Sequence, residues 1–132
     1  MPEYLFVYGT LRNNYDLKLK NRVAKYLEYV GEAKIGARLY DLGRYPGAIK
    51  DKTSEIIGDV FLLSDPEKVL KFLDDYEGSE YERKKEKVKL RSGKIIIAWM
   101  YWYKSVVKEE QRIFYKDYLN YLKKKSTLRK EE

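Results

Sequence analysis

The amino-acid sequence predicts one α+β domain, in which a small, largely antiparallel β-sheet closes as a barrel flanked by helices. The expected elements run strand, helix, strands, helix, hairpin, helix, which is not the regular alternation that builds a parallel sheet. Of the 132 residues, 44% are hydrophobic and 15% aromatic, enough for one packed core. We therefore expect a single domain over residues 1–122 and a basic, frayed tail over residues 123–132.

The first half of the chain alternates apolar, extended stretches with glycine-containing turns. Tyr4 to Tyr8 is β-branched and aromatic and stops at Gly9, which predicts a buried strand followed by a loop. Gly31 and Gly36 bracket a short extended piece. The expected elements are a strand over 4–8, a loop over 9–14, a helix over 16–29, strands over 37–42 and 58–63, and a turn over 45–47.

The second half begins with the helix that has the clearest sequence signals. Ser64 and Glu67 have the spacing of a capping box, Pro66 suits the first helical turn, and Gly78 is expected to end the helix. After it we expect a β-hairpin with strands over 82–90 and 95–103, and then a last helix over 107–122.

The composition excludes several kinds of catalytic and metal site. The chain contains no cysteine and no histidine, so disulfides, most zinc sites, Cys-His dyads and Ser-His-Asp triads are ruled out. Proton transfer would have to use Asp, Glu, Lys, Tyr, a backbone group or water. The first eight residues do not resemble a signal peptide and no stretch is long and apolar enough to cross a bilayer, so we expect a cytoplasmic protein.

The net charge of +7 has two interpretations. It arises from 28 Lys and Arg against 21 Asp and Glu. A surface rich in charges of both signs is typical of thermophilic proteins, whereas a basic excess with many tyrosines also suits a nucleic-acid-binding module. We favour the first interpretation, because the chain has no recognised nucleic-acid-binding signature.

Glu77 is the strongest candidate for a catalytic group. It follows Leu73 by four residues and Leu70 by seven, so it extends the apolar face of the predicted helix. Burial there would disfavour the charged form of the carboxyl and raise its pKa toward neutrality, as a general base requires. The alternative is that Glu77, just before Gly78, turns into solvent. Asp74 and Asp75 lie on other helix faces and are expected to be ordinary surface carboxylates.

A second candidate site is the loop that follows the first strand, Tyr8-Gly9-Thr10-Leu11-Arg12. Glycine lets the backbone turn sharply and approach a ligand closely. Successive N–H groups in such a turn can bind a carboxylate or an oxyanion. The simpler interpretation is a turn without a ligand.

A series of short segments then stands in a recognisable order. They are Tyr8-Gly9-Thr10-Leu11, Gly31-Glu32-Ala33, Leu39-Tyr40-Asp41-Leu42-Gly43 with Tyr45-Pro46-Gly47-Ala48, Gly58-Asp59-Val60-Phe61, Leu73-Asp74-Asp75-Tyr76-Glu77-Gly78 with Tyr81-Glu82-Arg83, and the strand from Ala98 to Tyr103. Together they resemble the gamma-glutamylcyclotransferase-like family, on its gamma-glutamylamine cyclotransferase branch. The resemblance covers roughly residues 4 to 105.

This resemblance implies a β-barrel enzyme whose pocket lies at the loop of residues 8–11. The implied reaction closes a γ-glutamyl group to 5-oxoproline and releases an amine or amino acid, with Glu77 as general acid/base. The backbone N–H groups of Gly9, Thr10 and Leu11 would hold the substrate carboxylate or the oxyanion. No metal or organic cofactor is implied, and the expected partner is a small γ-glutamyl compound, with no membrane and no nucleic acid.

The resemblance also draws attention to other side chains. Tyr81 and Arg83 match a Tyr-x-Arg pair of the family, and Arg83 could orient a carboxylate, although both could equally be packing and strand-surface residues. Tyr101 and Tyr103 alternate on one strand face and could touch the substrate, although core filling is the simpler role. Residues 13–18 lack the basic or histidine-containing stretch of many relatives, so several γ-glutamyl substrates stay open, as does a non-catalytic member that only binds a ligand.

Overall fold

The fold is taken from a computed structural model, which describes residues 2–9, 21–43 and 45–131, with side chains described as far as Ser126. Thr10, Leu11 and the rest of residues 10–20 lie outside the described residues, as do residues 1, 44 and 132. Predictions that fall on those positions are therefore not tested by the structure.

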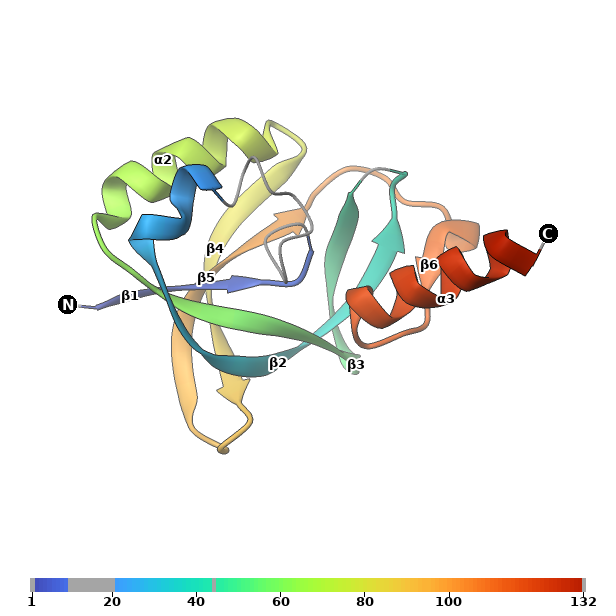
Figure 1. The fold of residues 1–132 in the computed structure, drawn as a ribbon, viewed down its shortest axis with the longest axis horizontal. Coiled ribbons are helices and arrows are strands. Elements are labelled where there is room, and N and C mark those ends of the chain that lie inside the picture. The colour runs from blue at the N-terminus through green and yellow to red at the C-terminus, as the bar shows by residue number, and fades with distance from the viewer. Residues whose placement is uncertain (1, 10–20, 44, 132) are drawn as a thin grey trace.

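Five strands close a small mixed barrel. They are β1 (Glu3–Val7), β2 (Leu27–Asp41), β3 (Pro46–Leu63), β4 (Tyr81–Leu90) and β5 (Ile95–Tyr103), labelled in Figure 1. Around the barrel the order is β3-β1-β5-β4-β2, and β2 pairs back to β3. The β1–β5 pair is parallel, and the other pairs in the barrel are antiparallel. This arrangement confirms the predicted α+β barrel.

The β2 and β3 strands are much longer than the sequence predicts. They pair continuously from Leu27 opposite Leu63 to Asp41 opposite Pro46, with register shifts near Gly31 and after Gly36. Such bulges keep a strand paired through irregular positions, so the glycines expected to bound a short piece lie inside one strand. Pro46 and Gly47 belong to β3, and the turn lies just before them, where the Leu42 N–H donates to the Tyr45 carbonyl at 3.0 Å.

The helical predictions are correct in part. Residues 21–23 are helical and η2 (Ala24–Tyr26) follows, but β2 begins at Leu27, so the helix expected to reach residue 29 ends earlier. Helix α2 (Pro66–Glu77) ends at Gly78 as predicted, with φ 82°. The capping box is wrong: the N-cap is Asp65, at φ 50°, and its side chain makes no capping hydrogen bond in the described structure.

The C-terminal region differs most from the prediction. Instead of one helix over 107–122 it has η3 (Glu109–Gln111), β6 (Arg112–Ile113) and then α3 (Tyr118–Glu131). Strand β6 pairs with β2 through Ile113, which is buried, while Phe114 is 78% exposed. Pairing with β2 therefore replaces the first half of the expected helix. Residues 123–131 are helical, and the division of the chain at residue 122 stays a prediction.

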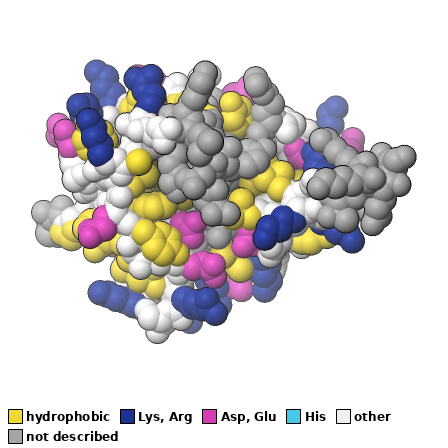
Figure 2. Space-filling view, in the orientation of Figure 1, with side chains coloured by type: hydrophobic (Ala, Val, Ile, Leu, Met, Phe, Trp, Pro, Cys, Tyr) yellow, Lys and Arg dark blue, Asp and Glu magenta, His cyan; other side chains and the backbone are white. Residues whose placement is uncertain are grey.

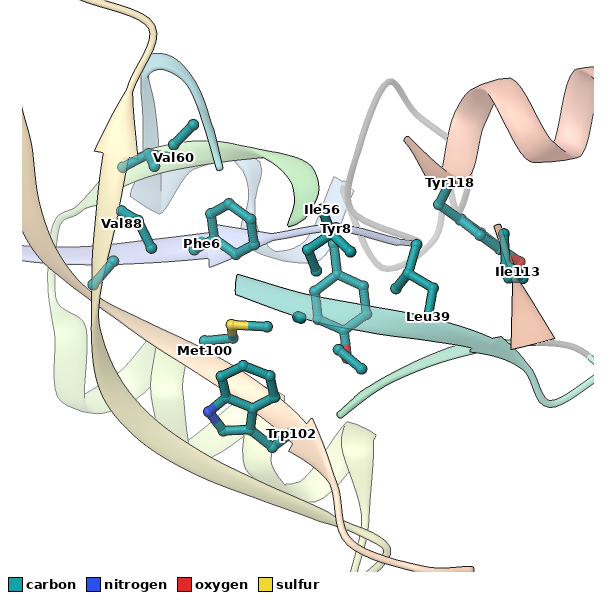
Figure 3. Packing of buried hydrophobic residues seen from close by; sticks show 14 residues of the cluster. Phe6, Tyr8, Leu39, Ile56, Val60, Val88, Met100, Trp102, Ile113 and Tyr118 are labelled. Carbon is teal, nitrogen blue, oxygen red and sulfur yellow. The ribbon is translucent and has the colours of Figure 1, made fainter. Parts of the chain in front are cut away.

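Two buried clusters position the candidate site. Side chains alternate along β1, so Phe6 and Tyr8 point into the barrel beside Met100 and Trp102 (Figure 3). Leu5 and Val7 point outward and pack with Leu70, Leu73 and Tyr101 between barrel and α2. The barrel is tight at Gly58, where a Cβ would lie 2.3 Å from the Val7 carbonyl oxygen. The alternation thus places Tyr8 inside the barrel and the α2 helix against its wall.

The surface carries charges of both signs. Figure 2 shows Lys and Arg side chains around one face with Asp and Glu side chains among them. Several form ion pairs, such as the exposed pair of Lys34 with Glu55 at 3.5 Å and the pair of Lys50 with the partly buried Glu86 at 3.4 Å. Within the described part of the chain, no helix is long and apolar enough to span a membrane.

Candidate active site

A pocket lies where the C-terminal end of α2 meets the end of β1. Its walls come from β1, the start of β3, α2, β4 and β5, so residues far apart in sequence meet in one place. The described residues that line it are Leu5, Phe6, Val7, Tyr8, Gly9, Tyr45, Pro46, Leu73, Glu77, Tyr81 and Tyr101. The structure therefore brings Glu77 together with Tyr8, Gly9 and Tyr81, all of which the sequence had singled out.

Glu77 reaches this pocket because α2 is amphipathic. Leu70 and Leu73 are buried against the barrel, and Glu77 follows one turn later on the same face. Its side chain is partly buried, and burial raises the pKa of the Glu77 carboxyl from 4.5 to about 7. The expected direction of this shift is thus present, and its cause is desolvation.

Tyr8 and Gly9 form the adjoining wall. The buried Tyr8 hydroxyl donates to the Tyr101 carbonyl oxygen at 2.8 Å. Burial raises the pKa of Tyr8 well above its ordinary value, and the negative forms of Tyr81 and Glu77 raise it further. A Cβ at Gly9 would stand 2.8 Å from Pro46 Cγ, so this close approach of chain to pocket wall requires glycine.

Tyr81 lies between β4 and the start of β3. Its hydroxyl donates to the Pro46 carbonyl oxygen at 2.9 Å, and its ring meets the Tyr103 ring edge-on at 5.3 Å. Burial raises the pKa of Tyr81, with a further contribution from the charge of Glu77. At neutral pH Tyr81 is therefore a neutral hydroxyl that fixes the pocket wall at Pro46.

Arg83 is placed differently from Tyr81 and does not line the described part of the pocket. Its Nε donates to Asp74 Oδ1 at 2.8 Å and its Nη2 to Asp74 Oδ2 at 3.1 Å, and its guanidinium lies 4.2 Å from the centre of the Trp99 ring. The carboxylate that Arg83 orients in this structure is thus one of the protein's own.

Asp74 was expected to be an ordinary surface carboxylate. It does lie at the surface, but its hydrogen bonds show that it is not an ordinary one. Besides the two Arg83 bonds it accepts the Tyr101 hydroxyl at 2.6 Å. Burial alone would raise the pKa of Asp74, but the hydrogen bonds from Arg83 and Tyr101 outweigh it and hold that pKa below its usual value. The sequence offered one signal for this role, the position of Asp74 three residues before Glu77. It could not show the partners of Asp74, because they come from β4 and β5.

Sequence reasoning also missed part of the pocket wall. Tyr45 and Pro46, which were not predicted as site residues, complete one side of the pocket. Tyr101 is buried in the core, as expected, and it also lines the pocket while its hydroxyl donates to Asp74. Tyr45 packs edge-on against Tyr76 at 6.3 Å. Within the described residues no group of three or more acidic side chains is placed to hold a metal ion. One half-buried carboxyl among tyrosine hydroxyls is an arrangement suited to proton transfer.

Comparison with known sequences shows which family this chain belongs to. The family described as "Gamma-glutamyl cyclotransferase, AIG2-like" matches residues 5–120. This chain belongs to the gamma-glutamylcyclotransferase-like family. Two relatives, from Methanocaldococcus jannaschii and Vibrio cholerae, both bear the name "Putative gamma-glutamylcyclotransferase". The first is 38% identical over 109 residues, covering 76% of this chain and 84% of the relative; the second is 32% identical over 105 residues, covering 78% and 84%.

Solved structures show that this member of the gamma-glutamylcyclotransferase-like family shares its fold with distant proteins. An AIG2-like protein from Mus musculus superposes with a TM-score of 0.73 at 21% identity, covering 89% of this chain and 88% of the other. An uncharacterized protein from Pyrococcus horikoshii superposes with a TM-score of 0.70 at 22% identity, covering 95% and 97%. These likenesses establish the fold predicted from the sequence.

Proposed function

We propose that this protein closes the γ-glutamyl group of a small substrate to 5-oxoproline and releases an amine or amino acid, with Glu77 as general acid/base. The observation that carries the proposal is the Glu77 carboxyl, which is half-buried in the pocket and has a pKa raised to about 7. A group with that pKa can both accept and donate a proton near neutral pH. Membership of the family supports the same reaction.

The proposed reaction needs no external nucleophile. Glu77 takes a proton from the substrate α-ammonium, and the free amine attacks the side-chain carbonyl carbon to form the lactam C–N bond. The attacking nitrogen then loses a second proton, and the bond to the leaving nitrogen breaks as Glu77 returns its proton there. The released amine takes up the second proton as ammonium. Because the attack is intramolecular, holding a cyclisable conformer can supply much of the rate.

The pocket wall formed by Tyr8 and Gly9 would bind the parts of the substrate that do not react. We extend the proposal to the loop that begins at Gly9, whose backbone, with that of Thr10 and Leu11, would hold the substrate carboxylate or the oxyanion. The place of Gly9 in the pocket supports this role, and residues 10 and 11 lie outside the described residues. Tyr8 and Tyr81 would shape the site as neutral hydroxyls.

The test is a turnover assay with a matched pair of variants. Formation of 5-oxoproline and release of amine are measured on γ-glutamyl amino acids, γ-glutamylamines and γ-glutamyl-ε-lysine. We expect Glu77→Gln to lower the rate by at least about 100-fold, the usual contribution of an acid/base group. Asp75→Asn, which neutralises an exposed carboxylate two residues away, should keep the wild-type rate.

Each outcome of this assay is informative. A folded Glu77→Gln variant with unchanged rate would exclude the mechanism. Failure of the wild-type protein to turn over any member of the panel, at warm as well as ambient temperature, would contradict the proposed activity on these substrate classes.

A further inference from the structure

Asp74 is shared by side chains from two neighbouring strands. Arg83 on β4 binds both of its carboxylate oxygens, at 2.8 and 3.1 Å, and Tyr101 on β5 donates to Oδ1 at 2.6 Å. Arg83 and Tyr101 are directly opposite each other in the β4–β5 register. Three elements of the fold are thus joined at one carboxylate, and two-pronged arginine–carboxylate pairs restrict geometry more than single bonds do.

The same group of residues continues into the pocket wall. The Tyr101 carbonyl oxygen accepts the Tyr8 hydroxyl at 2.8 Å, and both tyrosines line the pocket beside Glu77. Hydrogen bonds therefore connect Arg83, outside the pocket, with Tyr8 on the pocket wall. A displacement of the Asp74 carboxylate would free the Tyr101 hydroxyl and loosen the side of the pocket that contacts Glu77.

Asp74 also lies one helical turn before Glu77. In an α-helix, residues three apart lie on neighbouring surface positions, about 4.5 Å apart along the axis. The helix ends at once after Glu77, because Gly78 leaves it with φ 82°. The Gly78 N–H donates to the Asp74 carbonyl at 3.1 Å. Both the backbone and the side chain of Asp74 thus act on the last turn, which carries Glu77.

The contacts described for Arg83 are with the protein itself. Two of its N–H groups donate to Asp74, its guanidinium lies on Trp99, and it is not among the described residues that line the pocket around Glu77. We therefore assign Arg83 a role in holding the Asp74 carboxylate in place.

We propose that Asp74, Arg83 and Tyr101 form a positioning clamp that fixes the last turn of α2, and with it the Glu77 carboxyl, against the pocket wall. This inference rests on the proposed role of Glu77 as the acid/base. The three residues are positioning residues: Asp74 and Arg83 act from outside the pocket, and Tyr101 transmits their hold to its wall.

The test measures the titration midpoint of the Glu77 carboxyl by carbon-13 NMR, which needs no turnover, with the signal assigned by its loss in Glu77→Gln. Wild-type Glu77 should titrate near 7. A loosened helix end would expose the carboxyl, so we expect Asp74→Asn, Arg83→Gln and Tyr101→Phe each to lower the midpoint by about one pH unit or more. The other titratable side chains that line the described pocket are Tyr8, Tyr45, Tyr81 and Tyr101. Burial raises the pKa of Tyr8, Tyr81 and Tyr101, so these three hydroxyls stay neutral through this range.

The signs of the three shifts separate a clamp from a simple charge effect. Asp74→Asn removes a negative charge and Arg83→Gln a positive one, so charge alone would lower the Glu77 midpoint in the first and raise it in the second. Tyr101→Phe changes no charge and would leave it unmoved. A common downward shift supports the clamp, whereas opposite shifts would overturn it. If Asp74→Asn does not fold, Tyr101→Phe, which removes one hydroxyl, still decides between the two.

Kinetics on the same variants complete the experiment. We expect kcat to fall on the order of 10- to 100-fold with little change in KM, because a misplaced catalytic group affects the chemical step more than binding. The matched control is Asp41→Asn, which removes a carboxylate bound by Tyr121 at 2.6 Å and Lys125 at 2.9 Å. The Asp41 backbone pairs with Pro46, but its side chain binds α3 and is not among the residues that line the described pocket. This variant should leave both kcat and the Glu77 midpoint at their wild-type values.

Failure of the clamp and failure of the proposed function give different results. If Glu77→Gln keeps the wild-type rate, the proposed function fails, while the NMR midpoints still test the clamp. If Glu77 is essential but the three variants leave its midpoint and kcat unchanged, the clamp alone is overturned.

Discussion

Two aspartates in different parts of the molecule are held by nearly the same chemistry. Asp74, on α2, accepts a tyrosine hydroxyl at 2.6 Å and an arginine at 2.8 Å. Asp41, at the end of β2, accepts a tyrosine hydroxyl at 2.6 Å and a lysine at 2.9 Å, both from α3. Figure 1 places α2 and α3 toward opposite ends of the long axis. The two clusters therefore form a natural pair of active-site and structural examples.

What differs between the two clusters is their surroundings. The Asp41 side chain is the more buried, at 16% exposure against 42% for Asp74, and it ties the C-terminal helix to the barrel. Asp74 stands one turn from a half-buried carboxyl in a pocket. In both, hydrogen bonds and charge outweigh burial and hold the pKa of the aspartate below its usual value. The degree of burial of an ion pair is thus a poor guide to its role.

Of the changes that compare the Asp74 and Asp41 regions, removing the charge of Glu77, beside Asp74, should have the largest effect on the free energy of unfolding. The pKa of Glu77 is about 7 in the folded protein and near 4.5 when unfolded. A carboxyl whose pKa is higher in the folded than in the unfolded protein contributes its full stability at pH values below the unfolded pKa. This contribution is lost as the pH rises through the folded pKa of about 7. Ionised Glu77 at pH 8 therefore destabilises the fold by about 3 kcal/mol.

We expect Glu77→Gln to be more stable than the wild-type protein at pH 8, by up to about 3 kcal/mol. The advantage should shrink as the pH falls from 7 to 4.5. Urea unfolding at pH 8, 6 and 4 measures it, with Asp75→Asn as the exposed control. A difference between wild type and Glu77→Gln that does not change with pH would show that Glu77 is not desolvated in the folded state.

A smaller effect is expected from removing the matched tyrosine hydroxyls. Tyr101→Phe and Tyr121→Phe each delete one 2.6 Å bond to a carboxylate, and such bonds contribute about 2 kcal/mol. Both should lower the free energy of unfolding by a similar amount, but only Tyr101→Phe should lower kcat. Equal losses of kcat in the two variants, measured beside their unfolding curves, would mean that general destabilisation explains both.

The smallest effect should come from Lys125 in the Asp41 cluster. Its side chain is 33% exposed, so its ion pair is partly screened and should contribute about 0.5 kcal/mol. Lys125→Gln should lose that amount at low ionic strength and less in 1 M NaCl, where the screening length is about 3 Å. Thermal unfolding at the two salt concentrations measures this. A loss that is the same at both would assign the contribution of Lys125 to packing of its aliphatic stem.

Sequence reasoning located Glu77 because its signal is local. Leu70, Leu73 and Glu77 share one helix face, and Gly78 ends the helix, so the periodicity singled out the carboxyl. The resemblance to the family then favoured a site residue over a carboxylate that turns into solvent. The partners of Asp74 could not be found in this way. They depend on the register that sets Arg83 opposite Tyr101, and β4 is so rich in Lys and Glu that its pattern does not indicate which residues of β5 it faces.

The C-terminal region shows how tertiary pairing overrides a helical pattern. Phe114, Tyr118 and Leu122 recur every four residues, which predicted one helix over them. In the structure β2 has a free edge that accepts Arg112 and Ile113, and the helix begins only at Tyr118. Helical spacing indicates which residues could share a helix face. It does not indicate whether a strand far away in the sequence will pair with those residues instead.

The position of β1 in the barrel has a consequence for how the chain folds. β1 pairs antiparallel with β3 and parallel with β5. Residues 3–7 therefore cannot complete their pairing until residues 59–63 and 99 are available. The β2–β3 hairpin, in contrast, can form from neighbouring sequence. Pairings over such long separations form slowly. During synthesis β1 leaves the ribosome before the strands with which it pairs, so it is among the last of the described strands to be fixed. The pocket that it lines is completed only after β5 has emerged.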